Sequence, residues 1–309
     1  MTNILRFGNK LIAAVIIILT ITAVFIPSLS MLDQATDYLV HFLFLLIISG
    51  LIGLIVNSRT ILFTGFACAA ILALFLKNAS NTELKDPKIN DHGFISVAHV
   101  NLSLVTNVET IQDIIKQSDL DVISFQEYTP DWANIIPHLA AESYPFSYKD
   151  VRIDLYGKAV FSKYEIKNSR ITSYMEIPNV VVDIMKKNQI FKIVSSYMVP
   201  ALDKLSKVKA KYQYKMLGND IIQNQTNLIV MGEFNQVYWS HDIIEFRSKT
   251  KLLNSRRDIN PSSFKMPYDH IFYAPMLECY NFEDISDNEG NHIGCKSFFQ
   301  MRRAKNKLR

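Results

Sequence analysis

Oxygen-bearing side chains follow several apolar, strand-like runs in the second half of this chain. The run NLIVMGEFN ends in a carboxylate and an amide, and comparable residues close two earlier runs and open a later one. Strand ends are where α/β enzymes place their chemistry. Carboxylates and amides that converge there suit a hard divalent cation and a phosphate ester. The candidate residues are Asn101, Glu127, Glu233, Asn235 and Asp269.

Several polar residues at these strand ends also have a simpler structural explanation. Asn101 could cap a turn, Glu127 could be a solvated loop acid, and His270 could pack its ring in the core while bonding to backbone. Only their occurrence together at successive strand ends indicates a site.

The elements that must position these residues alternate between strand and helix. Strands are predicted at Phe94–Val100, Asp121–Phe125, Lys158–Ser162 and Tyr268–Tyr273, with a hairpin that turns at Lys187-Asn188. Helices are predicted over Val108–Lys116, Pro130–Glu142 with a break near Pro137, and Leu202–Gln223. Many strands with few helices predict a mostly antiparallel sheet, or a pair of sheets, flanked by helices.

The first quarter of the chain has a different character. Of the 309 residues, 49% are hydrophobic and 20% are charged, and the composition changes sharply near Lys77. The runs Leu11–Pro27, Tyr38–Val56 and Thr60–Leu76 each have about the length needed to cross roughly 30 Å of hydrocarbon. We predict three transmembrane helices. A signal peptide is the alternative for the first run, but two further apolar runs follow it.

The charges around these runs predict an orientation. Arg6, Lys10 and Arg59 flank the first run and the second loop, whereas the first loop holds Asp33 and Asp37. The positive-inside rule therefore places the amino terminus in the cytoplasm and residues 78–309 outside, in a multi-pass protein of the cell (inner) membrane. Cys279 and Cys295 could pair in an oxidising compartment or remain two unrelated thiols.

Charge gives no strong nucleic-acid signal. The net charge is +4, but the five bases at 302–309 contribute +5, and residues 78–301 before that tail are mildly acidic. Proteins that grip long nucleic acid usually carry a basic excess. We divide the chain into a membrane anchor (1–77), a linker (78–93), a folded domain (94–301) and a basic tail (302–309).

Five segments in this order resemble the endonuclease/exonuclease/phosphatase family, which includes pancreatic deoxyribonuclease and the sphingomyelinases. They are SVAHVN ending at Asn101, DVISFQEY containing Glu127, YGKAVFSKY at 156–164, GEFN at 232–235 and YDHIF at 268–272. The resemblance covers about residues 94–300, and the anchor resembles a bacterial membrane-bound subgroup. It implies a four-layered α/β/β/α sandwich, here preceded by three transmembrane helices, with a Mg²⁺- or Mn²⁺-dependent hydrolase site at one rim.

The resemblance also implies roles. Glu127 would ligate the metal, and Asn101 and Asn235 would position metal, phosphate or water. Glu233 would orient or deprotonate the attacking water, and Asp269 would orient a histidine from the last strand. A histidine in such a site stabilises the transition state or assists the leaving group.

Three departures from the family pattern predict weakened or lost catalysis. Glu233 replaces the family's aspartate, Tyr197 replaces a histidine, and Ile293, Gly294 and Cys295 stand where Ser-Asp-His is expected. His292 could reach the site only through a bulge or register shift, because an odd shift points a side chain to the opposite face of a strand. We therefore expect neither family histidine.

Three hypotheses follow from the sequence. The first is a working membrane-anchored, metal-dependent phosphoester hydrolase of unknown substrate. The second, favoured by the three departures, is a pseudoenzyme that keeps the fold and serves as a binding module outside the membrane. The third is a tethered interaction protein that uses the basic tail.

Overall fold

The computed structural model describes residues 2–25, 36–81, 83, 87–90, 93–116, 119–223, 226–257, 266 and 268–303. The predicted basic tail therefore lies largely outside the described residues. The chain divides into two compact units. One contains the amino-terminal helices together with Val237–Ile244, and the other contains both β-sheets.

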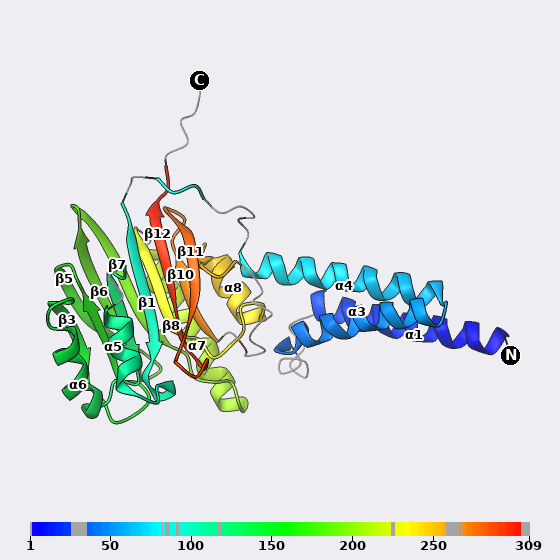
Figure 1. Cartoon of the computed structure of the whole chain (residues 1–309), viewed down its shortest axis with the longest axis horizontal. Helices are drawn as coiled ribbons and strands as arrows, with labels where there is room; N and C mark the ends of the chain where they lie inside the picture. Colours follow the sequence, from blue (N-terminus) through cyan, green and yellow to red (C-terminus); the bar gives the residue numbers. More distant parts are fainter. Residues whose placement is uncertain are drawn as a thin grey trace, which may run out of the picture. The chain divides into compact units, whose positions relative to one another are not determined.

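The amino-terminal unit contains helices α1 (Thr2–Phe25), α3 (Leu39–Ile55) and α4 (Arg59–Ser80), which coincide with the three predicted apolar runs (Figure 1). Two of them, over Phe7–Phe25 and Arg59–Ser80, are long and apolar enough to cross a membrane. The third has 17 residues and is shorter than that criterion. At about 1.5 Å per residue it spans roughly 26 Å, so the prediction of three full-length spans is not confirmed.

Glycines let α3 and α4 approach each other closely. A Cβ added at Gly53 would lie 2.4 Å from the Leu62 nitrogen, and one at Gly65 would lie 2.6 Å from the Gly50 nitrogen. Small residues at such contacts are typical of helices that pack in lipid, where burial from water does not drive association.

The second unit contains two six-stranded sheets (Figure 1). Sheet A has the order β11 (Leu277–Ser286), β12 (His292–Met301), β1 (Ile95–Asn101), β2 (Val122–Gln126), β4 (Lys158–Ser162), β3 (Phe146–Asp150). Sheet B has the order β5 (Ile166–Tyr174), β6 (Ile177–Lys186), β7 (Gln189–Tyr197), β8 (Leu228–Glu233), β10 (Asp269–Tyr273), β9 (Leu253–Asn254). Among the strands of the described residues, only the pairs β1/β2 and β7/β8 are parallel, so the predicted mostly antiparallel pair of sheets is confirmed.

Alternating side chains build the layers. On β1, Ile95 and Val97 point into the core between the two sheets, where they meet Val182 of β6 and Ile229 of β8. Ala98 and Val100 point to the other face of sheet A and pack against helices α5 (Val108–Lys116) and α6 (Pro130–Ala140). This period-2 alternation buries both faces of the strand.

Helices α7 (Lys204–Gln223) and α8 (His241–Thr250) pack against sheet B. Tyr214 of α7 contacts the rings of Phe234 and Phe246, and Phe246 of α8 packs edge-on against Phe272 of β10. Two sheets with helices on their outer faces form the predicted α/β/β/α arrangement.

Two local expectations have different outcomes. Lys187 and Asn188 both have positive φ, at 48° and 61°, as a two-residue type I′ hairpin turn requires, so the predicted turn is confirmed. The prediction of a break near Pro137 is wrong, because α6 continues through that residue to Ala140. One proline removes a single intrahelical hydrogen bond, and burial of Ile136 and Ala140 in the core of sheet A holds the last turn.

Candidate active site

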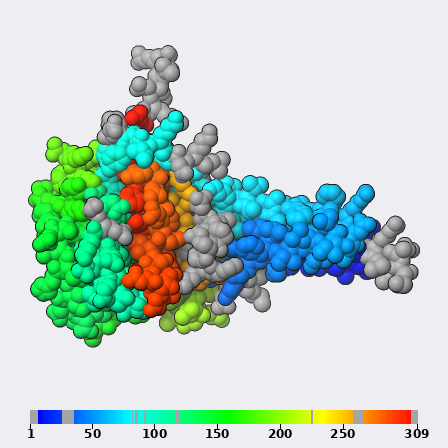
Figure 2. Space-filling model, viewed as in Figure 1, coloured from blue at the N-terminus to red at the C-terminus, as the bar shows by residue number. Residues whose placement is uncertain are grey.

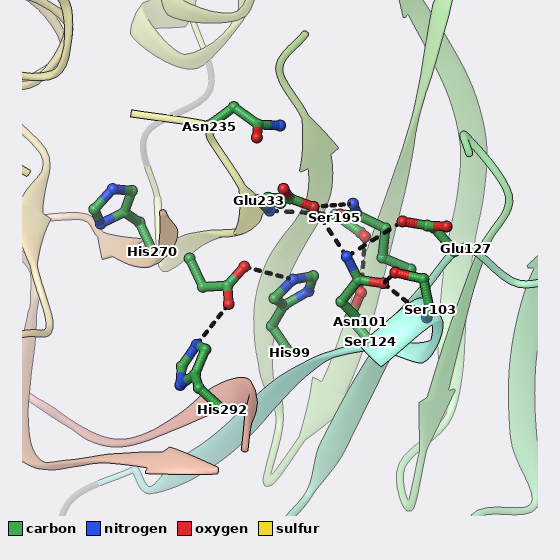
Figure 3. A network of polar contacts seen from close by, with 12 residues as sticks. His99, Asn101, Ser103, Ser124, Glu127, Ser195, Glu233, Asn235, His270 and His292 are labelled. Atoms are coloured by element: carbon green, nitrogen blue, oxygen red, sulfur yellow. Dashed lines mark hydrogen bonds and ion pairs between the residues drawn. The ribbon is translucent and has the colours of Figure 1, made fainter. Parts of the chain in front are cut away.

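The predicted acids and amides meet at one rim of the sandwich (Figure 3). Asn101 pairs with Gln126 at the end of the parallel strands β1 and β2. Glu233 ends β8 and lies opposite Asp269, the first residue of the antiparallel strand β10. Strand ends from both sheets therefore place Asn101, Glu127, Glu233 and Asp269 in one site.

Glu233 is the centre of the hydrogen bonds in this site. Its Oε2 accepts one hydrogen bond from Nδ2 of Asn101 and another from Nε2 of Gln126, each at 2.9 Å. Burial raises the pKa of Glu233, and the nearby carboxylates of Asp269 and Glu127 add to the increase, whereas His99 opposes it. A carboxyl group with a raised pKa is suited to accept a proton from water near neutral pH.

Asn101 connects the carboxylates. Its Nδ2 lies 3.4 Å from Oε1 of Glu127 in addition to its bond to Glu233. Its Oδ1 accepts hydrogen bonds from the backbone nitrogen and the hydroxyl of Ser103, at 3.0 and 2.9 Å. The structural alternative for Asn101, a turn cap, is therefore also present, and it fixes the amide with its NH₂ group toward the acids.

Glu127 has a strained backbone. Its φ is 57°, in the left-handed region that a glutamate rarely adopts. The next residue, Tyr128, is braced by Gly157, whose carbonyl accepts the Tyr128 N–H at 3.1 Å and whose own Cβ would lie 2.5 Å from the Tyr128 oxygen. Strain of this kind, which costs about 1–3 kcal/mol, collects at functional sites. The YGK segment thus serves to hold Glu127 in place.

Gly232 brings strands β7 and β8 close together beside the site. Its φ is 147°, and an added Cβ would lie 1.8 Å from the carbonyl oxygen of Ser196. No other residue type fits this position without moving the strand. The glycine of the GEFN segment therefore sets where Glu233 leaves the sheet.

Asp269 is held between two imidazoles. Its Oδ2 lies 2.8 Å from Nε2 of His292, and its Oδ1 lies 3.5 Å from Nε2 of His99, a close electrostatic contact that is long for a hydrogen bond (Figure 3). Burial acts to raise the pKa of Asp269, but the two imidazoles outweigh it and hold that pKa well below its usual range. Asp269 is therefore a buried carboxylate.

The expectation that the last strand supplies no histidine to Asp269 is wrong. Ile285 pairs with Gly294 and Ser286 pairs with His292, so Ile293 is an extra residue on β12, a β-bulge. Without the bulge, His292 and Cys295 would lie on opposite faces, since they are three positions apart. The bulge adds one residue and turns His292 back toward the site.

The two positions expected to mark lost catalytic residues have structural roles. A Cβ at Gly294 would lie 2.0 Å from the carbonyl oxygen of His99, so β12 needs glycine there to approach β1. Cys295 is fully buried in the core between the sheets, and burial raises the pKa of its thiol well above the usual value for cysteine. Cys279 and Cys295 do not form a disulfide; both are free and buried.

The network continues beyond His292 to a second acid. Nδ1 of His292 lies 3.7 Å from Oδ1 of Asp284, and Asp284 also accepts a hydrogen bond from Nη1 of the buried Arg256 at 3.0 Å. Each ring nitrogen of His292 thus faces a carboxylate, which fixes the orientation of the ring.

Tyr197 and Asn235 lie beside Glu233. Tyr197 ends β7 opposite Glu233 and contacts the ring of Tyr156. Burial, together with the negative charge of Glu233, raises the pKa of Tyr197. Asn235 also has a positive φ, of 51°, and its Nδ2 donates to the carbonyl of Met198 at 2.8 Å. Its amide donor is therefore used by the backbone of the residue that follows β7, and no hydrogen bond joins it to the acids in Figure 3.

His270 takes the structural role that the sequence left open. Its Nε2 lies 2.7 Å from the carbonyl of Gln236, and its ring stacks on Phe272. Burial lowers the pKa of His270 to about 4. The sequence analysis did not identify His99 and gave Gln126 no role. The positions of both residues point to the site, because Gln126 adjoins Glu127 and His99 lies two residues before Asn101, on the same face of β1.

The donor set fits a cation that keeps open coordination positions. Among the described residues, no group of three or more His, Cys, Asp or Glu side chains could enclose a metal ion. Mg²⁺ is usually held by one or two carboxylates together with water and substrate phosphate. Glu127 alone, with the Asn101 amide linking it to Glu233, matches that smaller requirement.

The comparisons with known proteins agree with this geometry. The sequence model of the Endonuclease/Exonuclease/phosphatase family matches residues 102–289. No curated protein matches the chain.

Several solved structures share the fold at low identity. A family protein from Bacteroides thetaiotaomicron has 14% identity and a TM-score of 0.54, with 69% of this chain and 97% of that one covered. The mannosyl-6-phosphatase Bt3783 of B. thetaiotaomicron VPI-5482 has 16% identity and a TM-score of 0.53, covering 66% and 99%. TDP2 of D. rerio, complexed with a single-strand DNA product, has 13% identity and a TM-score of 0.54, covering 68% and 100%.

These structures establish likeness of fold, and the family match spans more than half of the chain. With the acids, amides and histidine gathered at the rim of its two-sheet sandwich, the chain belongs to the endonuclease/exonuclease/phosphatase family.

Proposed function

We propose that this chain is a membrane-anchored, Mg²⁺- or Mn²⁺-dependent phosphoester hydrolase. The observation that supports the proposal best is the 2.8 Å contact between Asp269 and His292, because it supplies the imidazole that the sequence pattern lacks. The apolar helices α1 and α4 support membrane anchoring. We further propose that the sandwich lies outside the cell membrane, as the positive-inside rule indicates.

Each residue in the site has a proposed task. Glu127, whose carboxylate is oriented by the Asn101 amide N–H, would hold the cation, and when bound the cation supplies positive charge to the phosphate oxygens. Glu233, whose pKa is raised by burial, accepts a proton from the attacking water. His292, oriented by Asp269, stabilises negative charge that develops on the phosphate or assists the leaving group.

Hydrolysis by the full chain in detergent tests the proposal. With Mg²⁺ or Mn²⁺ we expect measurable turnover of an activated aryl phosphodiester or phosphomonoester, and Glu127→Ala should abolish it. Glu142→Ala, which removes an exposed carboxylate from the same unit, is the matched control and should leave turnover unchanged. Equal rates for Glu127→Ala and the parent chain would refute the assignment.

One observation favours a second candidate, a non-catalytic phosphate-binding module. Both ring nitrogens of His292 face carboxylates although the side chain is 17% exposed, and His99 is fully buried, so the ring nitrogens of His292 are directed at protein groups and His99 is closed to a ligand. Calorimetric titration with Mg²⁺ separates the two candidates. Binding that Glu127→Ala removes, in a protein without turnover, would establish the binding module.

A further inference from the structure

Helix α7 carries a second apolar stripe on the face that does not contact the sheet. Leu205, Val208, Tyr212 and Met216, spaced three or four residues apart, follow one face of the helix with exposed fractions of 78, 51, 51 and 40%. The atoms of α7 are visible at the surface in lime in Figure 2. Exposed apolar residues are normal singly, but a contiguous stripe marks an interaction site.

The opposite face of the same helix supports the candidate active site. Nε2 of Gln213 donates to the carbonyl of Tyr197 at 3.2 Å, and the Tyr214 hydroxyl donates to the carbonyl of Phe234 at 2.9 Å. Ala210 packs in a small cluster with Tyr197. The exposed stripe and the side chains that contact the strand ends of the site therefore lie on opposite faces of one helix.

The charge pattern identifies the partner. Between Lys204 and Met216 the helix has five lysines and no acidic residue, although the domain as a whole is mildly acidic. Lys204, Lys211 and Lys215 are exposed and border the stripe. An apolar stripe bordered by lysines is the pattern of a helix that lies in the interface of an anionic membrane.

A second exposed apolar segment is linked to α7 through one hydrophobic cluster. Val151, Ile153 and Leu155 alternate along the loop after β3, and Ile153 is 92% exposed. Tyr156, the next residue, packs in the same cluster as Ala210 of α7. Apolar side chains thus occur on both sides of that cluster at the rim of the site.

We propose that the outer face of α7 docks on the anionic lipid surface of the membrane in which the chain is anchored. The stripe would lie at the level of the headgroups with the lysines against lipid phosphates, which holds the active site at the membrane surface. The inference rests on the proposed membrane anchoring. It implies that the site acts on phosphate esters presented at that surface.

Site-specific fluorescence of the full chain in lipid nanodiscs tests the docking. The three native cysteines are buried, so a cysteine introduced by Val208→Cys can be labelled selectively with an environment-sensitive dye. Val108→Cys on α5 is the matched control, because Val108 is an exposed helical valine, 37% accessible, in the layer that covers the other sheet. Tyr212→Cys gives a second position on the stripe.

In nanodiscs with anionic lipid, brominated acyl chains should quench the dye at positions 208 and 212 but not at 108. Each lysine near an anionic surface contributes about fivefold to association, so replacing Lys204, Lys211 and Lys215 with Gln should lower the equilibrium constant for docking on the order of 10²-fold. Quenching should also fall with added salt.

The outcomes are distinguishable. Equal, weak quenching at 208, 212 and 108 in nanodiscs that contain the protein would overturn the docking and leave the anchor intact. Failure of the chain to enter nanodiscs would overturn the anchor and this inference together. A dye signal at 208 that depends on protein concentration and is insensitive to brominated lipid would show that a second copy covers the stripe, which also overturns the proposal.

Discussion

The length of the Glu233 side chain is the feature of the site that can be tested most directly. In Glu233→Asp the carboxylate retracts by one C–C bond, about 1.5 Å. The two hydrogen bonds of 2.9 Å from Asn101 and Gln126 would then lengthen to about 4 Å, beyond hydrogen-bonding distance. The backbone cannot follow, because Gly232 is already in contact with Ser196.

The loss can be estimated from the two bonds. Hydrogen bonds to charged groups contribute about 1.5–3 kcal/mol each. Because Glu233 is only partly buried, water can solvate a retracted carboxylate, so we expect the low end, about 3 kcal/mol of lost stability. Glu233→Gln keeps the length and removes the charge. Because the pKa of Glu233 is raised, its charge disfavours the folded state, and Glu233→Gln should unfold within about 1 kcal/mol of the parent at pH 8.

Urea unfolding in detergent measures the effect. With Trp239→Phe as background, Trp132 on α6 is the one remaining tryptophan, so its fluorescence reports on the sandwich. An Asp variant that unfolds within about 0.5 kcal/mol of the parent would refute the reasoning, because the two amide contacts would then contribute nothing to stability. A Gln variant as unstable as the Asp variant would show that the charge of Glu233, and not the length of its side chain, determines the loss of stability.

Three further predictions concern the strands around the site. His292→Gln should lower turnover about 10²–10⁴-fold in steady-state assays, the range for a lost acid–base group, and an unchanged rate would exclude His292 from catalysis. Burial lowers the pKa of Lys158 from 10.5 to about 7, so unfolding takes up a proton between those pH values. Stability should therefore rise by about 1.4 kcal/mol per unit between roughly pH 8 and pH 9, and urea unfolding of Lys158→Met should lack that slope. Gly294→Ala should cost at least about 3 kcal/mol because its Cβ meets the His99 carbonyl, whereas Gly218→Ala, whose Cβ meets nothing closer than 3.6 Å, should not destabilise the protein in the same measurement.

Much of the architecture was readable in the sequence because it depends on local patterns. Period-2 alternation, the two turn residues at Lys187-Asn188 and the apolar face of α5 each act over a few positions. The rim positions of Asn101, Glu127, Glu233 and Asp269 were predicted because polar residues close or open successive apolar runs.

The remaining parts depend on contacts between distant strands. Counting back from Cys295 placed His292 on the wrong face, because no sequence pattern marks Ile293 as the extra residue of a bulge. Gly294 suggested a lost aspartate, but glycine is required at this position because a Cβ would meet the His99 carbonyl on another strand. The contact of His99 with Asp269 joins residues 170 positions apart in different sheets, which local patterns do not encode.

The extra residue on β12 means that a single insertion decides whether this fold carries a histidine at Asp269. Relatives whose motif spacing differs by one residue can therefore have equivalent chemistry, while relatives with identical spacing and no bulge can lack it. Motif alignments that require fixed spacing will therefore miss a histidine placed at Asp269 by a bulge. Classification within this family should be made on the pairing of the final strand.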